Sequence, residues 1–227
     1  MNFSATNIIG QAWEVWKKHI VFTWMILGIM VAISIVFSIL NPKGDSAIIS
    51  ILSSLVSLFF ELGAIALLLK LVRTDTEGDI KEIAGQSAIY VQSLIATIVF
   101  GVMLFVGLLL LIIPGIYVAM RFMFLPYVLV DQKLGWKEAL KEASRLSEGN
   151  RLNLFGFVIL LAIMNVVGAL LLLVGLLVTA PVSYIAMTMM YEYLKKEKSG
   201  ATEEVKVEEP KKEEVIDLPA PTPEPAA

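Results

Sequence analysis

Residues 88–130 read AIYVQSLIATIVFGVMLFVGLLLLIIPGIYVAMRFMFLPYVLV, and Arg121 is the one charged residue among them. Crossing the roughly 30 Å hydrocarbon core of a membrane takes about 20 helical residues, because each residue advances a helix by about 1.5 Å. A run of 43 residues is therefore too long for one transmembrane helix. It predicts two, near residues 88–113 and 116–134, with the turn signal Pro114-Gly115 between them.

Apolar runs on both sides of this stretch predict four more spans. They lie near residues 20–40, 47–71, 152–174 and 176–194. The turn-forming residues Asn41-Pro42-Lys43-Gly44 separate the first two. Residues 1–194 are therefore expected to form a membrane domain of the all-α class, a polytopic bundle of six transmembrane helices.

The composition excludes several classes of protein. Apolar residues make up 57% and charged residues 17% of the 227, against roughly 45–50% and 25% in soluble domains. The first 194 residues carry 12 basic and 12 acidic side chains, too few to solvate a water-facing surface. This part of the chain has no basic face for nucleic acid. The chain contains no cysteine, so disulfides and thiolate metal sites are excluded.

The lysines and arginines predict the orientation. With six spans, 16 of the 18 lie on one side of the membrane, Lys43 lies on the other, and Arg121 lies within a span. Positively charged residues accumulate on the cytoplasmic side. We therefore expect a multi-pass protein of the cell membrane with both termini in the cytoplasm. An odd number of spans would abolish this separation of charge.

An amphipathic cytoplasmic segment precedes each predicted pair of spans, starting near Asn7, Asp79 and Trp136. We expect three short helices lying along the inner membrane interface. Packing on the bundle as water-exposed elbows is the alternative. Tryptophans suit the headgroup zone, and cations suit lipid phosphates. The candidate lipid-interface residues are Trp13, Trp16, Trp136, Lys137, Lys141, Arg145 and Arg151.

Polar residues within the spans form a candidate intramembrane site. Ser50, Ser54, Ser57 and Glu61 share one face of the second span, as a packing seam or as a cavity lining. An ionisable group in the membrane usually has a partner or a wet cavity. If Pro114-Gly115 is the apex of the second hairpin, Arg121 lies near the outer headgroups and away from Glu61. An apex near Gly107 would instead bring the two to the same depth.

Catalytic chemistry finds little support in the sequence. His19 is the one histidine and lies beside two lysines at the predicted inner interface, while Asp75, Glu77 and Asp79 form a solvated acidic turn. No cluster of metal ligands, phosphate-binding loop or pairing of a nucleophile with a base is evident. We therefore expect no enzyme activity, no cofactor and no metal. Residues 195–227 are rich in Lys, Glu and Pro and are expected to form a disordered cytoplasmic tail.

Residues 114–155 resemble a known family. The motif comprises Pro114-Gly115-Ile116-Tyr117, Arg121, Phe122, Phe124, Pro126, Asp131, Glu138-Ala139-Leu140, Ser144, Gly149-Asn150-Arg151 and Leu154-Phe155. It is similar to the membrane domain attached to some glycerophosphodiester phosphodiesterases and to related six-span proteins of uncharacterised function. The resemblance implies a bacterial or archaeal cytoplasmic-membrane protein. It implies no activity, because in the fused members the phosphodiesterase chemistry belongs to a separate soluble domain.

The leading interpretation is a non-enzymatic integral membrane protein that engages lipids or partner proteins at the inner leaflet. A small-solute or lipid transporter is the first alternative, and a continuous polar cavity from Glu61 would favour it. A phospholipid-modifying enzyme is the second, and it would require His19 or a carboxylate to converge with other polar groups. The expected partners are membrane lipids and not nucleic acid, and a protein partner or a second copy of the chain is left open.

Overall fold

The computed structural model describes residues 5–79, 81–170 and 174–207. These residues are helical throughout, with short connections and no strand. The helices are α1 (Ala5–Lys18), α2 (Ile20–Leu40), α3 (Ala47–Thr74), α4 (Lys81–Ala84), α5 (Ser87–Leu110), α6 (Ile112–Phe122), α7 (Leu125–Gln132), α8 (Trp136–Ser147), α9 (Arg151–Leu170) and α10 (Val174–Val207). The all-α class predicted from composition is confirmed.

Five segments of the described chain are long and apolar enough to cross a membrane. They are α2, α3, α5, the continuous stretch Ile112–Gln132 and α9. The protein is therefore a multi-pass membrane protein by length and composition of its helices. The sixth expected span, near 176–194, lies within α10 and stays a prediction.

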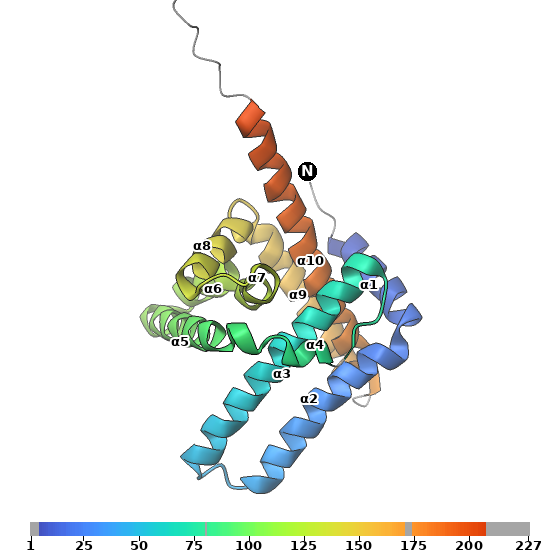
Figure 1. Ribbon diagram of the computed structural model, residues 1–227, viewed down its shortest axis with the longest axis vertical. Helices are drawn as coiled ribbons and strands as arrows, with labels where there is room; N and C mark the ends of the chain where they lie inside the picture. Colours follow the sequence, from blue (N-terminus) through green and yellow to red (C-terminus); the bar gives the residue numbers. More distant parts are fainter. Residues whose placement is uncertain (1–4, 80, 171–173, 208–227) are drawn as a thin grey trace, which may run out of the picture.

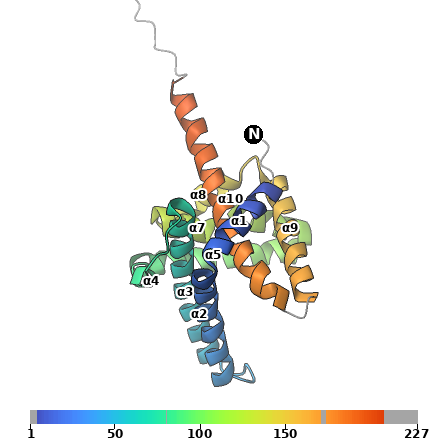
Figure 2. The ribbon, with the colours of Figure 1, turned by 90° about the vertical axis from the view of Figure 1, so that its right-hand side faces the viewer.

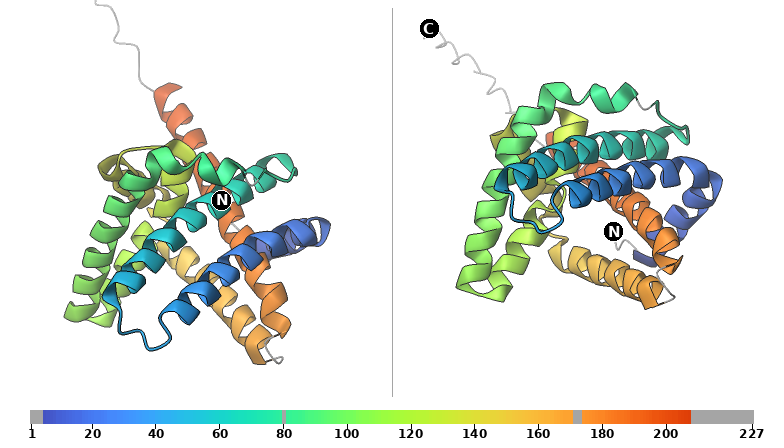
Figure 3. Two further views of the ribbon diagram at one scale, coloured as in Figure 1. Left: turned by 60° about the horizontal axis from the view of Figure 1, so that its bottom comes forward. Right: turned by 90° about the horizontal axis from the view of Figure 1, so that it is seen from below.

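Three antiparallel helix pairs spread apart from a common base within the described residues. They are α2 with α3, α5 with α6, and α9 with α10. In Figure 1 the first pair points downward and the second to the left, while Figure 3 shows all three diverging. Side chains near the free ends face outward: Leu109 is 76% exposed and Leu170 is 78% exposed. Exposed aliphatic side chains over most of α2, α5 and α9 indicate surfaces adapted to lipid.

The helix contacts close into a ring. The second pair returns through α6 and then α7, so that α3, α7 and α10 end the three return segments. Each return segment packs on the short helix that opens the next pair: α3 on α4, and α6 and α7 on α8. The last return helix, α10, packs on α1, which opens the first pair. Figure 2 shows α1 lying across α10. Three successive units of one short helix and one helix pair therefore surround a shared centre.

The core lies where the three return helices meet. Buried side chains run along α3 from Leu62 to Leu71, along α7 from Leu125 to Val130, and along α10 from Val182 to Leu194. The rings of Tyr127 and Tyr191 stack there, with centroids 5.6 Å apart. Offset aromatic pairs of this kind stabilise a helix contact beyond the area that they bury.

The apex of the second pair is Leu111, and the expected turn at Pro114-Gly115 is wrong. Leu111 is extended, with φ −170° and ψ 155°, and Pro114 lies within the first turn of α6. Proline is tolerated there because the first amides of a helix have no intrahelical acceptor, so the break falls before the proline. Gly115 instead packs on Gly107, where a Cβ on Gly107 would lie 3.1 Å from Gly115 Cα. The expected span 116–134 is also divided at Met123, into α6 and α7.

The expected boundary at Lys195 is not a break in the structure. Helix α10 continues through it to Val207, so residues 195–207 are helical rather than disordered. Two side chains hold the start of this extension: Lys195 pairs with Asp131, and Lys198 donates a hydrogen bond to the carbonyl of Glu148. Composition alone misses such contacts. The rest of the expected tail, residues 208–227, lies outside the described residues.

Candidate functional site

A groove between α2 and α10 opens on the surface of the helix bundle. Its wide part is lined by Leu27, Met30, Val31, Ser34, Ile35, Ser38, Ala180 and Tyr184. A narrow part continues past Leu27, Met30 and Tyr184 to Thr23, Ala64 and Leu68. From Leu27 to Ser38 the wide part of the groove follows α2 for about 16 Å, at 1.5 Å per residue. The walls are mainly apolar, with hydroxyl groups at intervals.

The groove is not predicted from the sequence. Ser34 and Ser38 are four residues apart in a strongly apolar span, which is the same signal that singled out the serines of the second span. The opposite wall, at Ala180 and Tyr184, comes from α10 and is brought there by the tertiary fold.

The serine face of α3 does not form a tight seam. Ser50 and Ser54 are exposed and donate hydrogen bonds to the carbonyls of Ser46 and Ser50 in their own helix. Asn41 also donates to the Ser50 hydroxyl, at 3.2 Å. Ser57 is half-buried. The Asn41–Ser50 contact links the end of α2 to the start of α3, and Ser50 lines a pocket at this turn together with Ser34 and Ser38 of α2.

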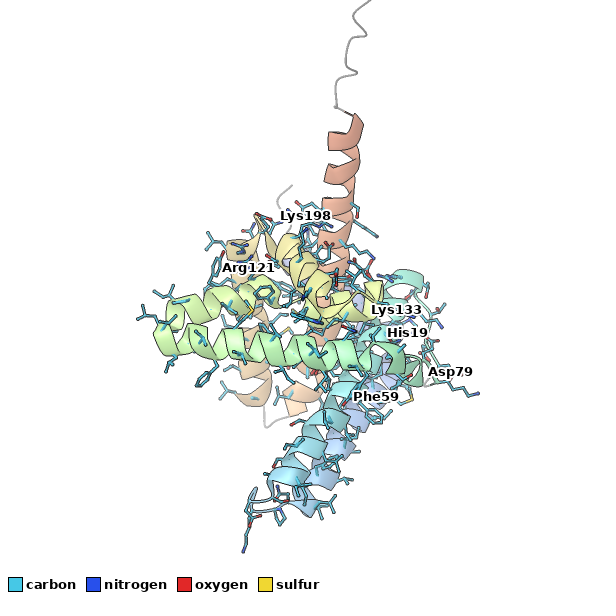
Figure 4. The ribbon with its side chains drawn as sticks, turned by 60° about the vertical axis from the view of Figure 1, so that its left-hand side comes forward. His19, Phe59, Asp79, Arg121, Lys133 and Lys198 are labelled. Atoms are coloured by element: carbon cyan, nitrogen blue, oxygen red, sulfur yellow. The ribbon has the colours of Figure 1, made fainter. Side chains whose placement is uncertain are left out.

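Glu61 and Arg121 do not pair. Glu61 is exposed, and the ion pairs of the described residues do not include it. The Nε of Arg121 donates to the Ser144 hydroxyl in α8 at 2.8 Å. Figure 4 shows Arg121 far from Phe59, which precedes Glu61 by two residues in α3. The short helix α6 turns Arg121 back to α8, so it does not lie at the outer end of the hairpin.

The apolar faces of α1 and α8 lie against the protein. In α1 the buried residues are Ile8, Ala12 and Trp16, and α1 packs on α10. In α8 they are Ala139, Ala143, Leu146 and Ser147, and α8 packs on α5, α6 and α7. This arrangement favours the alternative interpretation, in which these helices are elbows packed on the bundle.

Some of the candidate lipid-interface residues are buried or paired within the protein, and others are exposed. Trp16 is only 7% exposed, whereas Trp13 is 41% exposed. Arg145 pairs with Glu142 at 2.7 Å and lowers the pKa of that carboxyl group. Its charge is therefore already balanced within α8.

The remaining candidates lie on α8 or just after it. Lys137 and Lys141 are exposed, and the Lys137 ammonium lies 5.3 Å from the ring centroid of the half-buried Trp136. Arg151 donates a hydrogen bond to the Tyr117 hydroxyl at 2.6 Å. Among the candidates, Arg151 therefore joins two different helix pairs.

A network of charged groups closes the base of the bundle. Asp131 in α7 has a side chain only 4% exposed, and it pairs with Arg73 of α3 at 2.6 Å and with Lys195 of α10. Arg73 also pairs with Glu192 of α10 at 2.6 Å. The three return helices are thus joined by charge, in a geometry that balances the buried carboxylate.

A second cluster surrounds His19, at the junction of α1 and α2. Its Nδ1 lies 3.0 Å from Glu77 and its Nε2 lies 3.2 Å from Asp75. Lys18 and His19, in that order, lower the pKa of Asp75. A general base needs a ring nitrogen free to accept a proton, and here both nitrogens face carboxylates. The described residues contain no group of three or more His, Asp or Glu arranged to hold a metal ion.

Comparison with protein-family models, with curated proteins and with solved structures gives no match.

Proposed function

We propose that this protein is a non-enzymatic integral membrane protein that binds lipids. It has six spans and cytoplasmic termini, and it engages lipid at the inner leaflet and, through a groove that runs towards the outer end of α2, within the membrane. We also propose that it is related to the membrane domain attached to some glycerophosphodiester phosphodiesterases and lacks their activity. Five apolar helices and the distribution of lysines and arginines support the membrane topology.

The groove between α2 and α10 carries the lipid-binding proposal. The wide part follows α2 for about 16 Å, from Leu27 to Ser38, which is about one leaflet of a hydrocarbon core that is roughly 30 Å thick. Its lining of Leu27, Met30, Val31 and Ile35 is apolar and laterally open, which suits one acyl chain. The hydroxyls of Ser34 and Tyr184 add polar contacts at fixed positions along the chain.

Photocrosslinking tests the groove. The full chain is reconstituted in vesicles that contain a phospholipid with a diazirine in its acyl chain, and labelled peptides are identified by mass spectrometry. We expect labelling at Met30 and Tyr184. The Ala180→Trp variant fills the groove and should lower this labelling at least several-fold, whereas Ala162→Trp, on the exposed face of α9, should not. Equal labelling in both variants would contradict the proposal.

A lipid or small-solute transporter is the second candidate, and the position of Glu61 favours it. This carboxylate lies in a spanning helix, is exposed, and is absent from the ion pairs of the described residues. A charge in such a place usually marks a wet cavity or a substrate path. In vesicles with a fluorescent phospholipid in one leaflet, a transporter would move the label across the membrane. Glu61→Gln should then slow the movement, and an inactive wild-type protein would exclude lipid translocation.

A phospholipid-modifying enzyme finds little support. His19 does meet two carboxylates, which is the convergence that such an enzyme would need, but its two ring nitrogens both face them. The cluster fits an ion-paired junction between the α1–α2 elbow and the loop after α3. A protein partner and self-association are compatible with the lipid-binding proposal.

A further inference from the structure

Arg121 lies on α6, and Arg151, 30 positions later in the sequence, contacts the same helix through Tyr117. The Nη1 of Arg151 donates to the Tyr117 hydroxyl, and its guanidinium carbon lies 4.8 Å from the centroid of the Tyr117 ring. Tyr117 and Arg121 are four residues apart in α6, so their side chains are neighbours, with Cβ atoms about 6 Å apart. Arg151 of α9 therefore contacts a residue one helical turn away from Arg121, and Arg121 contacts α8 through Ser144.

The turn between α8 and α9 brings Arg151 to this place. Gly149 adopts φ +80°, a left-handed conformation that glycine adopts without steric cost. Arg151 is the first residue of α9. The first amide groups of a helix have no intrahelical acceptor and attract negative charge. The side chain and the start of its helix therefore favour the same kind of ligand.

The positive charge at this place is unbalanced. The salt bridges of the described residues pair Arg73 and Arg145 with carboxylates, but they include neither Arg121 nor Arg151. The Nε of Arg151 is buried and has no acceptor within the described part of the chain. A buried donor without an acceptor is costly. A bound anion would accept from it and would balance the charge of the arginines.

The surroundings identify the kind of anion. Exposed apolar side chains lie on the two diverging helix pairs beyond the arginines: Ile116 is 37% exposed on α6, and Leu152 and Phe155 are 85% and 37% exposed on α9. A free anion would gain nothing from these side chains, whereas the acyl chains of a phospholipid would cover them. Guanidinium groups match phosphate oxygens in a bidentate geometry.

We propose that Arg121, Arg151 and Ser144 form a binding site for the phosphate of an anionic phospholipid of the inner leaflet. The two arginines hold the phosphate and Ser144 orients Arg121, while Tyr117 fixes Arg151 beside it. The acyl chains lie between the α5–α6 and α9–α10 pairs. This inference rests on the proposed lipid-binding function and names a headgroup site separate from the groove between α2 and α10.

The test measures lipid selectivity of the full chain in phosphatidylcholine vesicles. Spin-labelled phosphatidylglycerol and spin-labelled phosphatidylcholine are compared by the fraction that the protein immobilises. We expect a preference for phosphatidylglycerol that falls about tenfold in R121Q/R151Q, since charge-assisted bidentate contacts are lost. The matched control K81Q/K196Q removes two exposed cations that lie outside the proposed site, on α4 and α10, and should keep the preference.

Further variants keep the inference testable if R121Q/R151Q does not fold. R121K/R151K retains the charge but loses the bidentate geometry, and Tyr117→Phe releases Arg151. Each should lower the preference by a smaller factor. A preference unchanged in all three variants, or an equal loss in the lysine control, would overturn the site.

Two further arms identify the source of the phosphate and separate the two proposals. Sodium phosphate, compared with chloride at equal ionic strength, should not displace the labelled lipid, and displacement would assign the site to free phosphate instead. Crosslinking at Met30 should persist in R121Q/R151Q. Absence of crosslinking at Met30 in the wild-type protein would reject the proposed lipid groove. If crosslinking occurs but the preference for phosphatidylglycerol is the same in R121Q/R151Q, only the headgroup site would be rejected.

Discussion

Tyr191 in α10 donates a hydrogen bond of 2.7 Å to Asp131 in α7, across 60 residues of sequence. The same carboxylate accepts from Lys195 of α10 and from Arg73 of α3. One side chain that is 4% exposed therefore joins the three return helices at their common end. The three helix pairs diverge from one another beyond this junction.

Replacing Asp131 with alanine should destabilise the bundle. The substitution leaves Lys195 without its carboxylate and Tyr191 without its acceptor, and Arg73 keeps only Glu192. Because the two cations are about one-third exposed, we expect a cost of about 2 kcal/mol, below the usual range for a fully buried pair. Unfolding by titration with a denaturing detergent measures it. Asp45→Ala, in the exposed α2–α3 turn, is the control and should change the free energy of unfolding little.

Gly168→Ala should weaken the contact between α9 and α10. A Cβ at Gly168 would lie 2.6 Å from the Thr179 hydroxyl and 3.0 Å from the carbonyl carbon of Gly175. The helices would have to move apart, at about 1–3 kcal/mol for an overpacked contact. Gly156→Ala in the same helix meets nothing within 4 Å and should be neutral or slightly stabilising. Thermal unfolding of the two variants in one detergent would show no difference if the contact were loose.

The loop after α3 should loosen at acid pH. Lys18 and His19 hold the pKa of Asp75 below its ordinary value, which is near 3.9. A carboxyl group with a lowered folded-state pKa stabilises the fold above its unfolded-state pKa, and that contribution is lost as the pH falls through the folded-state pKa. The protection factor of residues 75–79, which corrects the exchange rate for its intrinsic pH dependence, should therefore change little down to about pH 4 and fall more steeply below it. In Asp75→Asn this pH dependence should largely disappear.

The predicted topology places a reporter at the C-terminus in the cytoplasm and a reporter at Gly44 outside. A fluorescent protein fused after Ala227 should fold in the cytoplasm, and alkaline phosphatase fused there should be inactive. Alkaline phosphatase inserted at Gly44, between α2 and α3, should be active outside. An active phosphatase at the C-terminus would require an odd number of spans and would reject cytoplasmic placement of both termini.

Much of the architecture follows from local sequence. Long apolar runs predict the helices, because an isolated backbone in lipid must satisfy its hydrogen bonds within each segment. The Asn41–Gly44 turn separates α2 from α3 as expected. The break lies at Leu111, three residues before Pro114, because proline is compatible with the first turn of a helix as well as with a break.

The candidate sites depended more on position than on residue type. Arg121 was recognised as unusual from the sequence, but its partner Ser144 depends on the short helix α6 turning back to α8. His19 and the acidic loop were noted separately, and only packing of the α1–α2 elbow beside the end of α3 joins them. Spacing along one helix cannot reveal contacts between helices that are distant in the chain.

The amino-acid sequence by itself determined that this chain is a helical membrane protein, because hydropathy and charge act on each segment independently of the others. The tertiary structure alone decided which polar groups meet: Asp131 with three residues of α3 and α10, and Arg151 with Tyr117. It also decided that the helix pairs diverge and leave a groove between α2 and α10. These outcomes depend on the angles between packed helices, which are set by side-chain contacts across the bundle.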